Sequence, residues 1–289
     1  MTNATAIGNE ATVNTSNTIQ LGNSSVTDVF AGTSTTATLH TGGLQVTGGS
    51  PGVGKVLTSD ATGTATWQAA GGGGWGLSGN SGTVDGTDFI GTTDNIPFNI
   101  RVNNQKSGRI DPTLANTFYG YQSGNSNTTG SNNTASGSQA LLSNTTGSYN
   151  TSYGPSALHS NTTGNDNTAI GWWAMRANTT GYQNTGVGRQ ALNQNSTGIN
   201  NAAIGFLALF QNTTGASNSA NGSSALRENT TGSNNTASGY QALNKNLAGS
   251  NATAIGSGAM QYANDTSTPF QNSNVAVGFE ALRGSTTAS

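Results

Sequence analysis

Small, apolar and polar residues recur in one order every 17 residues along the second half of the chain. The motif reads Asn-Thr-Ala-Ile-Gly-x-x-Ala-Leu-x-x-Asn-Thr-Thr-Gly-x-x and is almost complete over residues 167–192. A strict period this short predicts a solenoid, in which each repeat is one coil stacked on its neighbour. The first glycine of the motif, called the key glycine below, stands at Gly120, Gly137, Gly154, Gly171, Gly188, Gly205, Gly222, Gly239 and Gly256, and again at Gly278 after an insertion of five residues.

Each repeat offers about three apolar positions to a core. The residue two before the key glycine is small, and Ala-Leu or Ala-Met follows three and four residues after it. We expect the larger residue of that pair to point inward, and burying each one contributes about 1.5–3 kcal/mol. These expected core residues are Leu141, Leu158, Met175, Leu192, Leu209, Leu226, Leu243, Met260 and Leu282. The second glycine of the motif, as at Gly147, predicts a turn with positive φ.

Such a core is thin, because ordering the backbone costs about 1–2 kcal/mol per residue. We therefore expect hydrogen-bond ladders between coils, formed by the backbone and by Asn and Thr side chains, to supply part of the stabilisation that the apolar core does not provide. Wrapping three chains around a common axis would bury a further face of each coil. The predicted assembly is an obligate oligomer, with a homotrimeric fibre as the favoured form.

The sequence divides into four zones and predicts an all-β fold. Residues 1–30 contain two similar pieces 14 residues apart, Ala6-Ile7-Gly8 and Gln20-Leu21-Gly22, typical of short β-roll repeats. Residues 31–75 alternate in period two between turn residues, which predicts a strand-rich connector. Residues 76–115 include a β-hairpin over 98–110, read as a neck region. Residues 116–289 form the parallel β-roll or β-solenoid of 17-residue coils.

Composition argues against several functions. Only 7% of the residues are charged, the net charge is −2, and the nine Lys and Arg residues do not suit nucleic-acid binding. The absence of cysteine excludes disulfides and thiolate metal sites. No apolar run approaches the roughly 20 residues of a membrane span. His40 and His159 lack metal-ligand partners at a suitable spacing, and no two carboxylates form an evident acid–base pair. We therefore expect no catalytic residues, metal or cofactor, and hence not an enzyme.

Aromatic residues interrupt the regular pattern of the repeats. Trp172 and Trp173 occupy the two variable positions after Gly171, and Tyr182, Phe206 and Phe210 follow nearby. An exposed apolar patch often marks an interaction surface, and aromatic faces stack well on sugars. These five residues are the candidate contacts for a receptor or glycan. The alternative is that they pack between neighbouring chains of a trimer.

The Asn-Thr-Ala-Ile-Gly-x-x-Ala unit resembles the head repeats of trimeric autotransporter adhesins of the YadA type, and the collar and shaft repeats of phage tail fibres. The 14-residue spacing of Ile7-Gly8 and Leu21-Gly22 is similar to the adhesin head period, and residues 54–68 resemble the strand-rich connector of fibre proteins. The resemblance implies a left-handed parallel β-roll, three chains per fibre, and attachment to a surface. A coiled-coil stalk, a C-terminal membrane anchor and a self-cleaving chaperone are not recognisable.

The leading functional hypothesis is a structural and adhesive fibre, from a phage tail, a contractile injection machine or a bacterial surface adhesin. Its expected partners are two further copies of the chain, a cell-surface receptor (a glycan or a surface protein) and a baseplate or fibre-attachment protein. Its expected location is extracellular, on a virion tail, a particle or a bacterial cell surface. The first residues show no secretory signal, which favours the phage-like option.

An ice-binding β-solenoid is the alternative function. Threonines recur at one position of the motif and could form a flat array. Against it, this column lies beside a glycine turn, and Leu247-Ala248 interrupts it. The column comprises Thr146, Thr163, Thr180, Thr197, Thr214 and Thr231.

Overall fold

The computed structural model describes residues 89–262 and 266–284 without a break, and before them residues 2, 4–8, 11–16, 19–21, 55–59, 65–69, 81–84 and 87. The chain divides into two compact units, residues 1–84 and 85–289. Within the described residues every regular element is a β-strand and no helix is present. The strands are β1 (Thr5–Ile7), β2 (Ile19–Leu21), β3 (Lys55–Ser59), β4 (Ala65–Ala69), β5 (Phe98–Val102), β6 (Gln105–Asp111), β7 (Asn116–Tyr119), β8 (Thr134–Ser136), β9 (Thr151–Tyr153), β10 (Thr168–Ile170), β11 (Thr185–Val187), β12 (Ala202–Ile204), β13 (Ser219–Asn221), β14 (Thr236–Ser238), β15 (Gly249–Ser250), β16 (Thr253–Ile255), β17 (Phe270–Gln271) and β18 (Val275–Val277).

The first unit contains two separate strand pairs. Strands β1 and β2 are parallel, with Thr5 opposite Ile19, so the 14-residue spacing in the sequence corresponds to one step between strands. Strands β3 and β4 form an antiparallel pair in which Leu57 lies opposite Trp67. Most of the expected connector over residues 31–75 lies outside the described residues.

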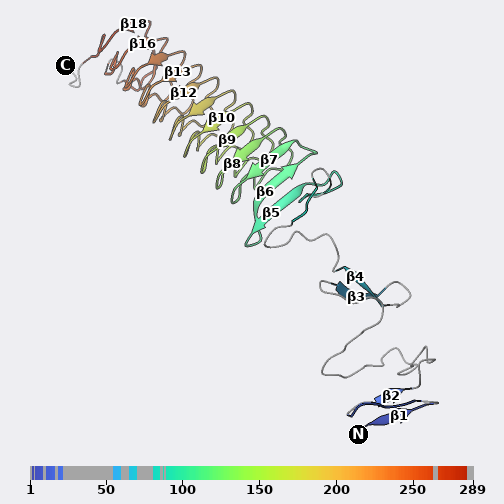
Figure 1. Ribbon diagram of the computed structural model, residues 1–289. Helices are drawn as coiled ribbons and strands as arrows, with labels where there is room; N and C mark the ends of the chain where they lie inside the picture. The colour runs from blue at the N-terminus through green and yellow to red at the C-terminus, as the bar shows by residue number, and fades with distance from the viewer. Residues whose placement is uncertain are drawn as a thin grey trace. The chain divides into compact units, whose positions relative to one another are not determined.

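The second unit is a parallel β-solenoid, as the 17-residue period predicts (Figure 1). Its main sheet has 12 described strands in the order β18-β16-β14-β13-β12-β11-β10-β9-β8-β7-β6-β5. From β7 onward neighbouring strands are parallel, and residues 17 apart lie opposite one another, as Thr168 and Thr185 do. The pairing of β16 with β18 spans the five-residue insertion, and Thr253 still lies opposite Val275.

The core consists of the three inward positions of each coil. Ala169, Ala174 and Met175 of one coil are all fully buried, and the equivalent residues of its neighbours form one continuous apolar column. Leu141, Leu158, Leu192, Leu209, Leu226, Leu243 and Met260 are likewise fully buried, whereas Leu282 is 59% exposed because no further coil covers it in the described part of the chain. The core thus closes within a single chain, and additional chains would pack on its outside.

Backbone conformation corrects one prediction about glycine. The second glycine of the motif, as at Gly147, does not have positive φ. It is required for a different reason: an added Cβ would lie 2.4 Å from the Gly164 carbonyl oxygen of the next coil. Positive φ occurs instead at the key glycines, between 126° and 140°, and at the buried Leu or Met four residues later, as at Leu192 with φ 50°.

Two columns of buried asparagine connect the coils, as the sequence analysis predicted. In the first, the Asn184 Nδ2 donates to the Gly198 carbonyl at 2.8 Å, and its Oδ1 accepts the Asn201 backbone N–H at 3.0 Å. In the second, the Asn178 Nδ2 donates to the Oδ1 of Asn161 at 2.7 Å. These bonds satisfy polar groups that the thin coil could not otherwise bury. The first column comprises Asn116, Asn133, Asn150, Asn167, Asn184, Asn201, Asn218 and Asn235, and the second comprises Asn144, Asn161, Asn178, Asn195, Asn212, Asn229 and Asn246, with the half-buried Asn127 at its N-terminal end.

Threonine hydroxyls form a third ladder between coils. The Thr162 Oγ1 donates to the Thr179 carbonyl at 3.1 Å, and the Thr179 Oγ1 donates to the Ser196 carbonyl at 3.0 Å. These threonines are half-buried, and each precedes an exposed threonine such as Thr163. Both predicted kinds of side-chain ladder are therefore confirmed.

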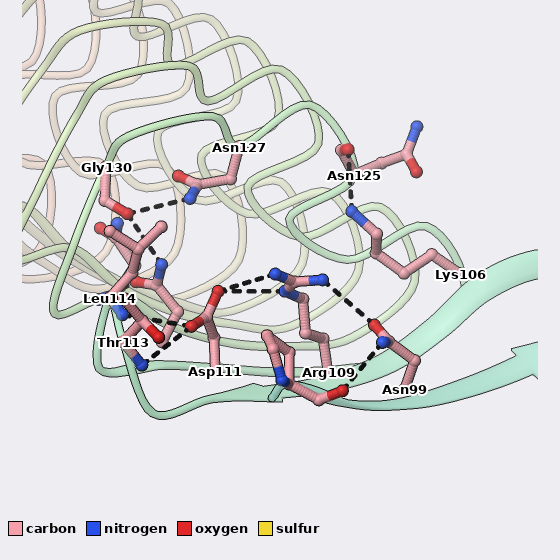
Figure 2. Close-up of polar contacts among 12 residues, drawn as sticks. Asn99, Lys106, Arg109, Asp111, Thr113, Leu114, Asn125, Asn127 and Gly130 are labelled. Carbon is pink, nitrogen blue, oxygen red and sulfur yellow. Dashed lines mark hydrogen bonds and ion pairs between the residues drawn. The ribbon is translucent and has the colours of Figure 1, made fainter. Parts of the chain in front are cut away.

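An antiparallel hairpin covers the N-terminal end of the solenoid. Strands β5 and β6 turn at Asn103 and Asn104, both with positive φ, as a two-residue hairpin loop requires. The buried Asp111 at the end of β6 accepts from Arg109 at 2.8 Å and from the backbone N–H groups of Thr113 and Leu114 (Figure 2). The hairpin predicted over residues 98–110 is thus confirmed, and it joins the solenoid sheet directly.

Replacement of Asp111 by asparagine should loosen this end of the solenoid. Burial alone would raise the pKa of Asp111, but the hydrogen bonds from Arg109, Leu114 and Thr113 outweigh it and lower the pKa. A carboxyl of this kind stabilises the fold above its unfolded pKa of about 3.9, and that stability is lost as pH falls through the folded value. Asp111→Asn should cost about 2 kcal/mol at pH 7. Urea unfolding of both proteins at pH 7 and below pH 3 should show the difference shrinking in acid; an equal difference at both pH values would contradict the assignment.

Candidate functional site

The outward positions of each coil carry the features available for binding. In the strands, the residues three and one before the key glycine point outward on either side of the buried alanine, as Thr168 and Ile170 do around Ala169. We call these two rows the sheet-face columns. The residue directly after the key glycine lies past the end of the strand, at a turn that we call the key-glycine corner. At this position Trp172, Arg189 and Phe206 follow one another in successive coils. The solenoid therefore aligns residues far apart in sequence into rows.

An aromatic and arginine cluster occupies three neighbouring coils. The Trp172 and Trp173 rings lie 4.6 Å apart between centroids and are tilted by 36°. The Arg189 guanidinium lies 4.5 Å from the Trp172 ring centroid and 5.6 Å from that of Phe206, and Arg176 lies 5.2 Å from that of Trp173. Each contact falls within the range of a cation–π interaction. We call Trp172, Trp173, Arg176, Arg189 and Phe206 the aromatic–arginine cluster.

The two arginines of the cluster have no carboxylate partner in the described part of the chain. The ion pairs found there join Arg109 to Asp111, Arg227 and Lys245 to Glu228, and Arg283 to Glu280. Arg176 and Arg189 are exposed and stack on rings instead. His159, one coil before Arg176, has its pKa lowered by burial and by the Arg176 charge, so its imidazole is neutral at pH 7. The positive charge of this surface at neutral pH therefore comes from the two arginines.

The structure brings together some of the sequence-predicted contacts and separates others. Trp172 and Phe206 are 40% and 44% exposed, and both contact Arg189, while Trp173 is half-buried beneath Arg176. Phe210 is half-buried, in the row that holds Arg176. Tyr182 is exposed but belongs to a row after the second glycine, outside the cluster. Sequence reasoning missed Arg176 and Arg189. The feature of the sequence that could have revealed them is a charged residue at a position that mostly holds polar or aromatic residues in other coils.

A second surface feature runs along the sheet-face columns. From Thr117 to Val277 these two rows contain no charged residue. Several of their apolar members are exposed, and the row continues onto the hairpin, where Ile100 lies opposite Gly108 and Gly108 opposite Tyr119. A shallow hollow lined by Ile100, Val102, Ser107, Tyr119, Gly120 and Tyr121 lies at this end. The exposed apolar members of the rows are Tyr119, Tyr153, Ile170, Ile204, Ile255, Val275 and Val277.

The described residues hold no group of three or more His, Asp or Glu side chains placed to bind a metal ion. They also include no helix with the length and apolar character needed to cross a bilayer. In the comparisons with known proteins, no family model matches the chain, and no curated protein and no solved structure matches it.

Proposed function

We propose that this chain is a structural and adhesive fibre protein that assembles as a homotrimer and attaches to a cell surface. The observation that carries the proposal is the uncharged, partly apolar face that the sheet-face columns present along the whole solenoid. Large exposed apolar surfaces are uncommon on monomers, and the centres of protein interfaces are depleted in charge. A rigid rod with a closed core also suits a mechanical role, and nothing in the proposal requires catalysis.

The resemblance of the repeats to YadA-type adhesin heads and phage fibre shafts supports the same reading. On this proposal the protein belongs to a phage tail, a contractile injection machine or a bacterial surface adhesin, outside the cell. Its partners are two further copies of the chain, a receptor on the target cell and a protein that anchors the fibre. The sheet-face columns of three chains face a common axis, and the corner and turn positions remain available to the receptor.

Charge placed on the sheet face should prevent assembly. We expect light scattering to give the wild-type protein three times the mass of one chain. The double variant Ile170→Lys with Ile204→Lys should have the mass of a single chain. Both isoleucines are exposed on the solenoid, so the lysines are tolerated by a single chain but not within a desolvated interface. Thr163→Lys with Thr197→Lys places the same charges on the exposed threonine column and should leave the trimer intact.

The trimer proposal is wrong if the wild-type chain is a compact monomer at micromolar concentration, or if both lysine pairs act alike. Negative-stain images of the wild type should show thin rods. Binding of labelled fibres to candidate host cells, compared between the trimer and the lysine variant, tests the adhesive role.

One observation favours the ice-binding alternative. The threonines at 146, 163, 180, 197, 214 and 231 are all exposed and stack in one row, at the roughly 4.8 Å spacing of neighbouring strands. The row is a single file, because the preceding Thr or Ser of each pair is half-buried with its hydroxyl bonded to the next coil. Thermal hysteresis of the purified chain decides this point: a clear effect, lost in Thr180→Lys, would favour ice binding over attachment.

A further inference from the structure

The aromatic–arginine cluster is the strongest local departure from the repeat, in shape and in charge. Two of the chain's four tryptophans lie here side by side, in two positions that hold no tryptophan in any other coil and that hold Ser or Gln in several of them. The strands keep the same register in neighbouring coils that lack tryptophan at these positions. The coil geometry therefore does not require tryptophan at either position.

The geometry leaves the hydrogen-bonding edges of the arginines available. Arg189 places its guanidinium carbon over the Trp172 and Phe206 rings, and no hydrogen bond or ion pair engages its guanidinium N–H groups in the described residues. Arg176 is placed in the same way on Trp173. A guanidinium that is held over an aromatic ring and whose N–H groups are unengaged can donate two parallel N–H bonds to a carboxylate or another planar anion.

The surrounding charges do not neutralise the two arginines. The nearest acidic residues in sequence are Asp166, which lies in a different row near the strand, and Glu228, which is engaged by Arg227 and Lys245. The exposed rings add flat apolar faces at either end of Arg189. Trp172 and Phe206 stand two coils apart, about 10 Å along the solenoid at the strand spacing. The cluster thus combines a cation with two stacking surfaces over the length of a short oligosaccharide.

We propose that the aromatic–arginine cluster binds an acidic saccharide. The carboxylate of the sugar accepts hydrogen bonds from Arg189, with Arg176 adding positive charge, while the C–H face of a sugar ring stacks on Trp172 or Phe206. This inference rests on the proposed attachment function, for which it names the receptor chemistry. It places the ligand beyond the key-glycine corner, beside the sheet face proposed as the trimer interface.

The repeat itself supplies conservative variants for the test. Arg189→Ser, Trp172→Ser and Phe206→Ser each introduce the residue found at the same position in other coils, at Ser138, Ser223 and Ser257. Tyr240→Ser is the matched control, because Tyr240 is an exposed aromatic residue at that position in a coil without a neighbouring arginine on its ring. All four variants should keep the wild-type thermal unfolding temperature and oligomeric mass.

The probe is trigalacturonic acid, measured by calorimetry or by tryptophan fluorescence of the full chain. We expect saturable binding that weakens with added salt, and a loss of roughly tenfold or more in affinity for Arg189→Ser. Trp172→Ser and Phe206→Ser should also weaken binding, and Tyr240→Ser should not. Maltotriose, which lacks the carboxylate, should bind at least tenfold more weakly than the acidic sugar.

Three results would overturn the proposal: equal binding of maltotriose, unchanged affinity in Arg189→Ser, or tighter binding of a single-stranded oligonucleotide, which would indicate a phosphate site. Cell attachment of the same variants separates this inference from the proposed function. If trigalacturonate binding is lost in Arg189→Ser but attachment is unchanged, the saccharide site stands and its role as the receptor contact is refuted.

Discussion

Gly188→Ala should break the stacking of its coil, with a loss of about 3–5 kcal/mol. Gly188 has φ 130°, a conformation that residues with a Cβ rarely adopt, and an added Cβ would lie 2.6 Å from the Gly205 carbonyl oxygen of the next coil. That oxygen belongs to the backbone and cannot move aside without displacing the neighbouring coil. The substitution therefore combines local strain with a clash at the interface between two repeats.

The control lies two residues away, where Gly186→Ala makes the same chemical change. Gly186 occupies an inward position that holds alanine at Ala169 and Ala203, and its added Cβ would lie 2.9 Å from the Met175 Cγ and 3.3 Å from the Ala191 carbonyl oxygen. We expect a cost below about 1.5 kcal/mol. Thermal unfolding followed by circular dichroism, with limited proteolysis, should show early opening near residue 188 only in Gly188→Ala. Similar unfolding of both variants would contradict the account of coil stacking.

Asn184→Ala should destabilise the solenoid by about 3–5 kcal/mol, because it leaves several buried polar groups without partners. The Asn184 side chain donates to Gly198 and Asn167 and accepts from the backbone and side-chain N–H groups of Asn201. Water cannot replace these bonds, since the neighbouring asparagines of the column are themselves buried. Chemical denaturation in urea measures the loss.

Gln194→Ala is the matched comparison for the asparagine column. Gln194 is an exposed amide in the same stretch of solenoid and makes no side-chain hydrogen bond in the described structure. Its removal should change the free energy of unfolding by less than about 0.5 kcal/mol. If Asn184→Ala were equally mild, the ladders would not be a major source of stability. The thin apolar core would then have to carry the solenoid alone.

The candidate site could be anticipated only in part from the sequence. Trp172, Trp173 and Phe206 stood out because they break a regular pattern, and the structure places all three around arginines. The arginines themselves do not stand out in the sequence, since Arg176 and Arg189 are 13 positions apart and nothing local connects them. Tyr182 was grouped with the tryptophans by proximity in sequence, although its row is a different one.

The sequence by itself determined the solenoid, the length of each coil, the buried Ala and Leu or Met positions, and the presence of asparagine ladders. It could do so because a strict repeat imposes the same environment on every copy, so periodicity alone reveals which side chains share a row. Only the tertiary structure decided why the second glycine is needed, that the buried leucines adopt positive φ, and that the core closes within one chain. These features depend on distances between stacked coils, and contacts across a stack are set by three-dimensional packing that residue spacing does not specify.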